Sequence, residues 1–184
     1  MIIYVHDPRS PFPRYVTFTA HRDYGPAEHI VISATMSITQ IAQAVVRKAN
    51  RPNDIWLLVL LAHGNSGWLQ FGQGLTASTA SQFAAAKPYM NPFLFGVEIH
   101  GCAVASDTQI ADNPFVGLQG EGRSSPTSGI NMLQVLAKTL GCTVKGAIDA
   151  QRVDTDGRYN GPYVVARSNG KIEIWEGDKI KWIR

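Results

Sequence analysis

An uninterrupted apolar segment, Ile55 to Ala62, constrains the fold of this chain more than any other feature. A strand with one face in water alternates apolar and polar residues, so a run without polar residues predicts a strand buried on both faces. Such strands belong to parallel sheets that helices cover on both sides. A second buried strand is predicted at Phe95 to His100. The apolar run is far shorter than the about 20 residues that a membrane-spanning helix needs, so no membrane span is predicted.

The rest of the chain alternates between helix and strand signals. Ser37, followed three residues later by Gln40, is a capping box that opens a helix reaching about Ala49. A second helix is predicted from Ser128 to Leu140, where the apolar residues share one helical face. This order predicts an α/β fold with a doubly wound sheet, in a single domain spanning residues 1–184. The other predicted elements are a crossover helix at 77–88, strands at 2–5, 15–20, 29–33 and 142–148, a β-hairpin of 163–166 and 171–175, and an edge strand ending the chain.

Composition narrows the class of protein. The chain has 184 residues, 45% hydrophobic and 17% charged, which suits one globular domain with one core. The net charge of +3 is scattered, with no basic stripe interleaved with aromatic residues, so a nucleic-acid partner is not predicted. The N-terminus lacks the basic start and cleavage site of a signal peptide, which predicts a cytoplasmic protein.

The two cysteines, Cys102 and Cys142, could form one disulfide. In a reducing compartment two free thiols are the stronger expectation. No Cys-x-x-Cys or His-x-x-x-His spacing occurs, so neither a metal site nor a cofactor is predicted.

Two reactive side chains, each beside a glycine, follow the two buried strands: His63 precedes Gly64, and Gly101 precedes Cys102. In doubly wound sheets, function sits outside the carboxyl ends of the strands. If the two strands are neighbours, the imidazole meets the thiol there. A thiol has a reference pKa of about 8.5, so it needs a base to take its proton, and the same imidazole can then protonate a leaving amine. The N–H groups of Gly64 and Cys102 are the expected oxyanion donors; losing one such donor costs about 3 kcal/mol of barrier.

These motifs resemble a known family. The sequence Leu-Ala-His-Gly-Asn-Ser-Gly-Trp-Leu-Gln-Phe-Gly, at Leu61 to Gly72, is similar to the histidine motif of caspase-like (clan CD) cysteine peptidases. It is closest to a bacterial subgroup, largely a domain of unknown function, that also carries a Gly-Cys-Asn-Val-Ala motif and a later Leu-x-x-x-x-Gly-Ala-x-Val segment. The counterparts here are His100 to Ala105 and Leu136 to Val144. The resemblance covers roughly Ile55 to Asp149, about half of the chain.

The resemblance implies a three-layer caspase-like sandwich, with helices on both faces of the central sheet. It also implies a cysteine endopeptidase that hydrolyses protein or peptide substrates through a thioester acyl-enzyme, without a cofactor. His63 would be the general base and acid, and Cys102 the nucleophile. This chain departs from the family pattern at Ala103, where Asn is usual, and in a loop insertion at about 107–127. In caspases the activating cleavage falls after the nucleophile, so Arg123 is a hypothesis for a self-processing site.

Other roles stay open. Asp107 and Asp149 follow predicted strands, and an acidic pocket would select Arg or Lys at the cleavage position. Trp68 either lines a substrate cleft or packs in the core. His100 lies two residues before Cys102 and is an alternative base, although packing under a neighbouring helix is expected more. An alternative of another class is a catalytically silent recognition module that keeps the fold, because fold does not establish function.

Overall fold

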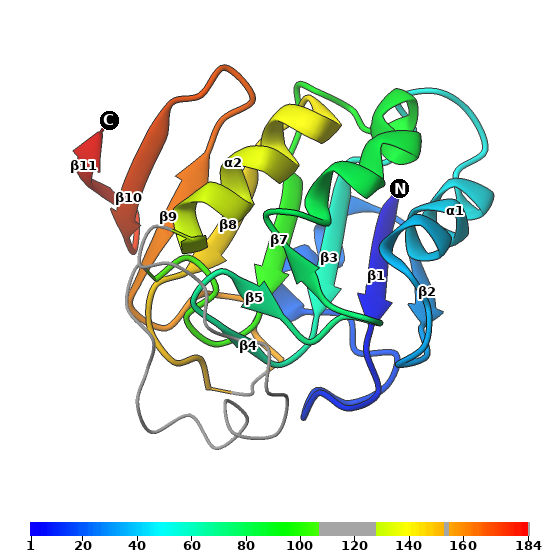
Figure 1. Ribbon diagram of the computed structural model, residues 1–184, viewed down its shortest axis with the longest axis horizontal. Coiled ribbons are helices and arrows are strands. Elements are labelled where there is room, and N and C mark those ends of the chain that lie inside the picture. Colours follow the sequence, from blue (N-terminus) through cyan, green and yellow to red (C-terminus); the bar gives the residue numbers. More distant parts are fainter. Residues whose placement is uncertain (107–127, 153–154, 184) are drawn as a thin grey trace.

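The computed structural model describes residues 1–106, 128–152 and 155–183 (Figure 1). Its centre is an eight-stranded sheet in the order β11-β10-β9-β8-β7-β3-β1-β2. The predicted α/β class with a large, mostly parallel sheet is confirmed. The parallel strands are β1 (Ile2–His6), β2 (Ala27–Val31), β3 (Leu57–Leu61), β7 (Gly96–His100) and β8 (Val144–Ala147), and the antiparallel run is β9 (Pro162–Ala166), β10 (Ile172–Glu176) and β11 (Lys179–Ile183).

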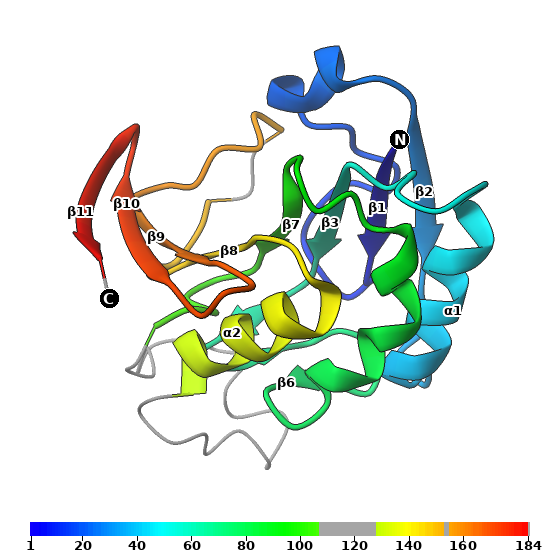
Figure 2. The same ribbon diagram turned by 90° about the horizontal axis from the view of Figure 1, so that it is seen from above.

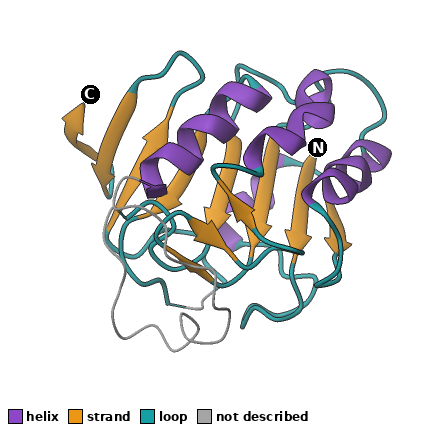
Figure 3. Ribbon diagram, in the orientation of Figure 1, coloured by secondary structure: helices purple, strands orange, loops and turns teal. Residues whose placement is uncertain are grey.

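The longer helices all lie on one face of the sheet (Figure 2). α1 (Ile38–Lys48) starts at the predicted capping box: Gln40 N–H donates to Ser37 Oγ (3.2 Å), and Ser37 N–H donates to Gln40 Oε1 (2.9 Å). α2 (Ser128–Leu140) is confirmed as well. The predicted crossover helix is a 3₁₀ helix, η2 (Ala80–Tyr89). The opposite face carries the short 3₁₀ helix η1 (Thr19–Tyr24), and Figure 3 separates these helices from the strands.

Two hydrophobic clusters, one on each face, hold the sheet. Alternate residues of β3 divide between them: Leu58 and Leu60 face α1, η2 and α2, while Leu57, Val59 and Leu61 join the other cluster. All five residues of β3 are buried, which confirms the strand buried on both faces that its composition predicts. Burying one such leucine contributes about 1.5–3 kcal/mol.

The strand predicted at 15–20 is wrong. Tyr15 has φ +61°, a left-handed conformation that interrupts an extended chain. Val16 and Phe18 pack onto the sheet face rather than pairing along an edge, and Phe18 N–H donates to the Tyr4 hydroxyl (3.1 Å). The alternating apolar residues of this segment therefore belong to a loop that packs on one face of the sheet, not to a strand paired within it.

A small second sheet follows β3 at its carboxyl end. It consists of β4 (Gly64–Asn65), β5 (Trp68–Leu69) and β6 (Leu75–Thr76), paired antiparallel in that order. Gly67 N–H donates to Val104 O (3.1 Å), and Ser66 Oγ donates to Ser106 O (2.6 Å). These bonds fasten the small sheet to the segment that follows β7. Within the described residues, no helix combines the length and apolar character needed to cross a bilayer.

Candidate functional site at the carboxyl ends of β3 and β7

β3 and β7 are neighbours and run parallel, with Leu61 paired to His100. His63 and Cys102 each lie two residues beyond that pair, so they leave adjacent strands at the same edge of the sheet. The sequence argument for this pair required the two strands to be neighbours, and their pairing confirms that condition.

Gly64 packs directly against the backbone of Cys102. A Cβ at Gly64 would lie 2.9 Å from Cys102 O, 3.2 Å from Cys102 N and 2.4 Å from Val104 Cγ1. A Cβ at Gly101 would lie 2.6 Å from Leu69 Cδ1 and 3.1 Å from Ala62 O. Both glycines are thus required by close approach of two chain segments.

A Gly64→Ala protein should lose about 1–3 kcal/mol of unfolding free energy, the usual cost of overpacking. The added methyl group meets the Cys102 backbone and the short Val104 side chain, which have little room to move. Gly101→Ala is the matched control: its closest neighbour is the flexible end of Leu69, so its loss should be smaller. Urea denaturation of both variants measures the difference. An equal loss in the two variants would contradict this packing.

The His63 ring is half-buried and held by the turn after β1. Burial lowers the pKa of His63 below its ordinary value. A hydrogen bond with the backbone of Arg9 and the charge of Asp7 act in the opposite direction, and the Arg9 charge again lowers it. Because this hydrogen bond raises the pKa, it stabilises the charged ring. A ring N–H must therefore donate it, and the acceptor is the Arg9 carbonyl. With a lowered pKa, the imidazole is neutral at pH 7 and able to accept a proton.

The thiol of Cys102 is half-buried in the turn after β7. Gln151 N–H donates to its Sγ (3.4 Å), and Gln151 O lies 3.7 Å from the same sulfur. Cys142 is also a free thiol, but it is buried, and burial raises its pKa to about 12. The two cysteines are therefore free, as expected, and differ in environment.

The residue after Cys102 has a strained backbone. Ala103 is buried and has φ +49°, a left-handed conformation that costs an L-residue roughly 1–2 kcal/mol. Its N–H donates to Asp149 O (2.9 Å), and Ala105 N–H donates to Ala147 O (2.9 Å). The turn is thus held against the end of β8. Strain of this kind concentrates at functional sites.

The other predicted site residues are distributed differently. Asp149 is exposed, and its carbonyl holds the turn that contains Cys102. Trp68 is half-buried on β5. The ring of His100 stacks on Tyr159 (4.9 Å between ring centroids) and lies 3.4 Å from Glu98 Oε2, so it belongs to a network on the η1 face. Asp107 and Arg123 lie outside the described residues.

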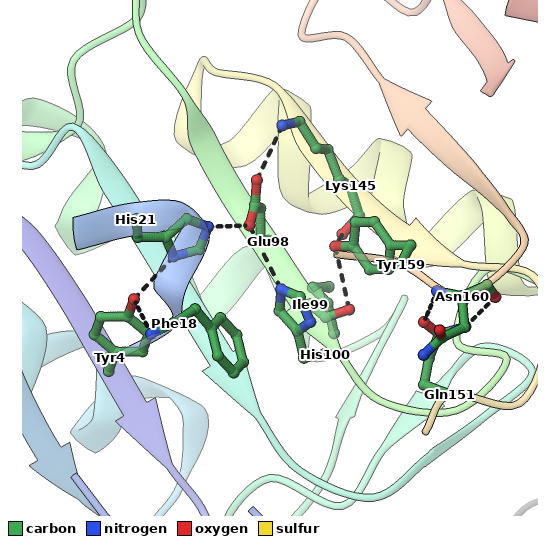
Figure 4. A network of polar contacts seen from close by, with 10 residues as sticks. All are labelled: Tyr4, Phe18, His21, Glu98, Ile99, His100, Lys145, Gln151, Tyr159 and Asn160. Atoms are coloured by element: carbon green, nitrogen blue, oxygen red, sulfur yellow. Dashed lines mark hydrogen bonds and ion pairs between the residues drawn. The ribbon is translucent and has the colours of Figure 1, made fainter. Parts of the chain in front are cut away.

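That network centres on Glu98 and is absent from the sequence prediction (Figure 4). Glu98 Oε1 accepts a hydrogen bond from Lys145 Nζ (2.9 Å), and Glu98 Oε2 accepts one from His21 Nε2 (3.0 Å). Burial alone would raise the pKa of Glu98, yet hydrogen bonds from His100 and His21 and the Lys145 charge hold it well below 4.5. The signal was present in the sequence: Glu98 and His100 are the polar residues of an otherwise apolar strand, and buried polar groups need partners.

A cavity of about 430 Å³ opens beside Glu98, lined by His21, Lys145 and Tyr159 among others. Tyr159 is followed by Asn160, whose N–H donates to Gln151 Oε1 (2.8 Å). Figure 4 shows the contact between Asn160 and Gln151, and the Gln151 N–H in turn donates to Cys102 Sγ, so this short chain of contacts joins the cavity wall to the thiol.

Over residues 1–106, 128–152 and 155–183, no three His, Cys, Asp or Glu side chains gather as ligands for a metal ion. Comparison of the chain with protein-family models, with curated proteins and with solved structures found no match.

Proposed function

We propose that this protein is a caspase-like cysteine endopeptidase, with His63 as general base and acid and Cys102 as nucleophile. The observation that carries the proposal is the pairing of β3 with β7, because it delivers both residues to one sheet edge with Gly64 packed on the Cys102 backbone. The proposed fold family is the three-layer caspase-like sandwich with a C-terminal β-hairpin.

In the proposed reaction, His63 takes the thiol proton and the Cys102 sulfur attacks the scissile carbonyl. The N–H groups of Gly64 and Cys102 would stabilise the oxyanion. His63 then gives its proton to the amine as the C–N bond breaks, which leaves a thioester. Water activated by the same imidazole hydrolyses the thioester and restores the thiol.

Three local features support this chemistry. A neutral imidazole at pH 7 is the form that a base requires. The Gln151 N–H that donates to Sγ (3.4 Å) fixes the position of the proposed nucleophile. The left-handed Ala103 occupies the position where the resembled family usually has Asn, a residue that tolerates this conformation better.

Substrate selection is part of the proposal. The backbone carbonyl of Asp149 holds the Cys102 turn, and the carboxylate of this exposed residue is proposed to select a basic residue at the cleavage position. Trp68, half-buried on the small sheet, is proposed to line the cleft. Asp107 as a second acidic contact and self-processing at Arg123 remain predictions that fall outside the described residues.

A second candidate function, a catalytically silent recognition module, is favoured by one observation. Both backbone groups of Gln151 lie against the Cys102 sulfur, within 3.4 and 3.7 Å, and this cap would hinder attack on a substrate.

Labelling of the two thiols separates these functions. Wild-type protein should react with a peptidyl acyloxymethyl ketone at Cys102, located by peptide mass mapping, and should cleave members of a peptide library. Cys142 should stay unlabelled because it is buried with a raised pKa. A Cys142→Ala protein is the control and should label as wild type does. Folded protein that neither labels at Cys102 nor cleaves any library member would establish the silent module instead.

A further inference from the structure

Asp7 follows β1 directly, and its side chain is fully buried. Its Oδ1 accepts from Arg9 N–H (3.0 Å) and from Arg9 Nε (2.8 Å). Its Oδ2 accepts from Arg9 Nη2 (2.6 Å) and from Gly72 N–H (3.0 Å). Each oxygen of the carboxylate therefore accepts two hydrogen bonds. Arg9 Nε and Nη2 bind the two oxygens in the two-point geometry that makes Arg–carboxylate pairs strong.

Arg9 completes a clasp around Gly72. Its Nη2 also donates to Gly72 O (2.8 Å), so the Asp7–Arg9 pair holds both backbone groups of that glycine. Gly72 ends the segment that starts at His63, and Gln70 N–H within it donates to His63 O (2.7 Å). The same Arg9 whose side chain holds this segment presents its carbonyl to the His63 ring.

We propose that Asp7 and Arg9 form a positioning pair that fixes the tautomer of His63 by holding the Arg9 carbonyl against its ring. The clasp holds the Arg9 carbonyl in place, and a carbonyl can bond only a ring nitrogen that carries a proton. The proton is thereby directed to that nitrogen in the neutral ring. The catalytic meaning of this pair rests on the proposed function, whereas its effect on the ring does not.

The two charges of the pair act on the ring with opposite sign. The Asp7 carboxylate raises the pKa of His63 and the Arg9 guanidinium lowers it. Both belong to the turn after β1, and among the described residues that directly follow β7 (101–106) the titratable group is the Cys102 thiol. Removing one member of the pair therefore leaves the other charge uncompensated beside the imidazole.

The test is an NMR titration of the His63 ring in full-length Cys102→Ala protein, which removes the thiol as a coupled group. Asp7→Asn should move the titration midpoint of His63 down. Arg9→Gln should also move it down, because loss of the bond to the Arg9 carbonyl outweighs loss of the Arg9 charge. Arg9→Lys keeps the charge but loses the two-point geometry, so the midpoint should again fall while nitrogen shifts show a mixture of tautomers. Glu28→Gln is the matched control, because that carboxylate acts on His29.

An upward shift of the midpoint in Arg9→Gln, or nitrogen shifts in Arg9→Lys that report the single wild-type tautomer, would overturn the positioning pair. Arg9 is 30% exposed, so the Arg9 variants are expected to fold even if Asp7→Asn does not. The readout is independent of peptide cleavage. Lowered midpoints and mixed tautomers in a protein that cleaves nothing would uphold the pair and reject the peptidase.

Discussion

A Cys102→Ala protein should lose peptide cleavage almost completely, with kcat/KM falling by roughly 10⁶-fold, the scale seen when a covalent nucleophile is removed. The reason is chemical: no other nucleophilic side chain is proposed for the acyl step, and the remaining groups only bind and polarise the substrate. The measurement is kcat/KM on the best peptide from the library. Because the thiol is half-buried and alanine preserves the backbone, unfolding free energy should change little.

The control for this variant is Cys142→Ala, which changes the same type of side chain at a buried position between α2 and β8. It should leave kcat/KM near the wild-type value, even if cavity formation lowers stability. Cleavage that persists in Cys102→Ala and disappears in Cys142→Ala would identify Cys142 as the nucleophile and reject the proposed role of Cys102.

A Glu98→Gln protein should lose about 3–5 kcal/mol of unfolding free energy, as expected when one partner of a buried ionic network is removed. The carboxylate accepts from Lys145, His21 and His100, and an amide would place a donor against one of these donors. Chemical denaturation at neutral pH measures the loss. A change below about 1 kcal/mol would show that the network stabilises nothing.

Glu28→Gln makes the same chemical change in an exposed pair with Lys48 and should lower the unfolding free energy far less, because water screens exposed ion pairs. The Glu98 effect should also depend on pH in a defined direction. Its folded-state pKa lies below 4.5, so its contribution is fully present above that value and is lost as pH falls through the lower folded-state pKa. The gap between wild type and Glu98→Gln should therefore narrow on acidification.

The sequence predicted the strands best where burial dictated composition. β3 was visible because every residue of it is apolar, and α1 because Ser37 and Gln40 form a cap from neighbouring residues. The segment at 15–20 failed because its alternation comes from packing against β1 rather than from pairing. Residues 77–88 were assigned as a helix, but Pro88 lies within the helix and its turns are 3₁₀.

The candidate site divides in the same way. The meeting of the β3 and β7 ends followed from parallel-strand logic and two short motifs. The Asp7–Arg9 clasp and the Glu98 network did not, since each depends on contacts between residues far apart in the chain. Nothing in the sequence around Asp7 connects it to Gly72, 65 positions later.

The wide spacing of these contacts also governs when the site can exist. Gln151 reaches Cys102 across 49 residues, and Asp7 reaches Gly72 across 65. Contacts between residues this far apart form only after the intervening parallel strands have paired. Strand pairing of this kind is slow relative to helix formation. A chain emerging from the ribosome thus carries a histidine and a cysteine with no shared geometry until the segment after β8 has docked. The protein is expected to gain the contact between Gln151 and the Cys102 thiol as one of the last events of folding.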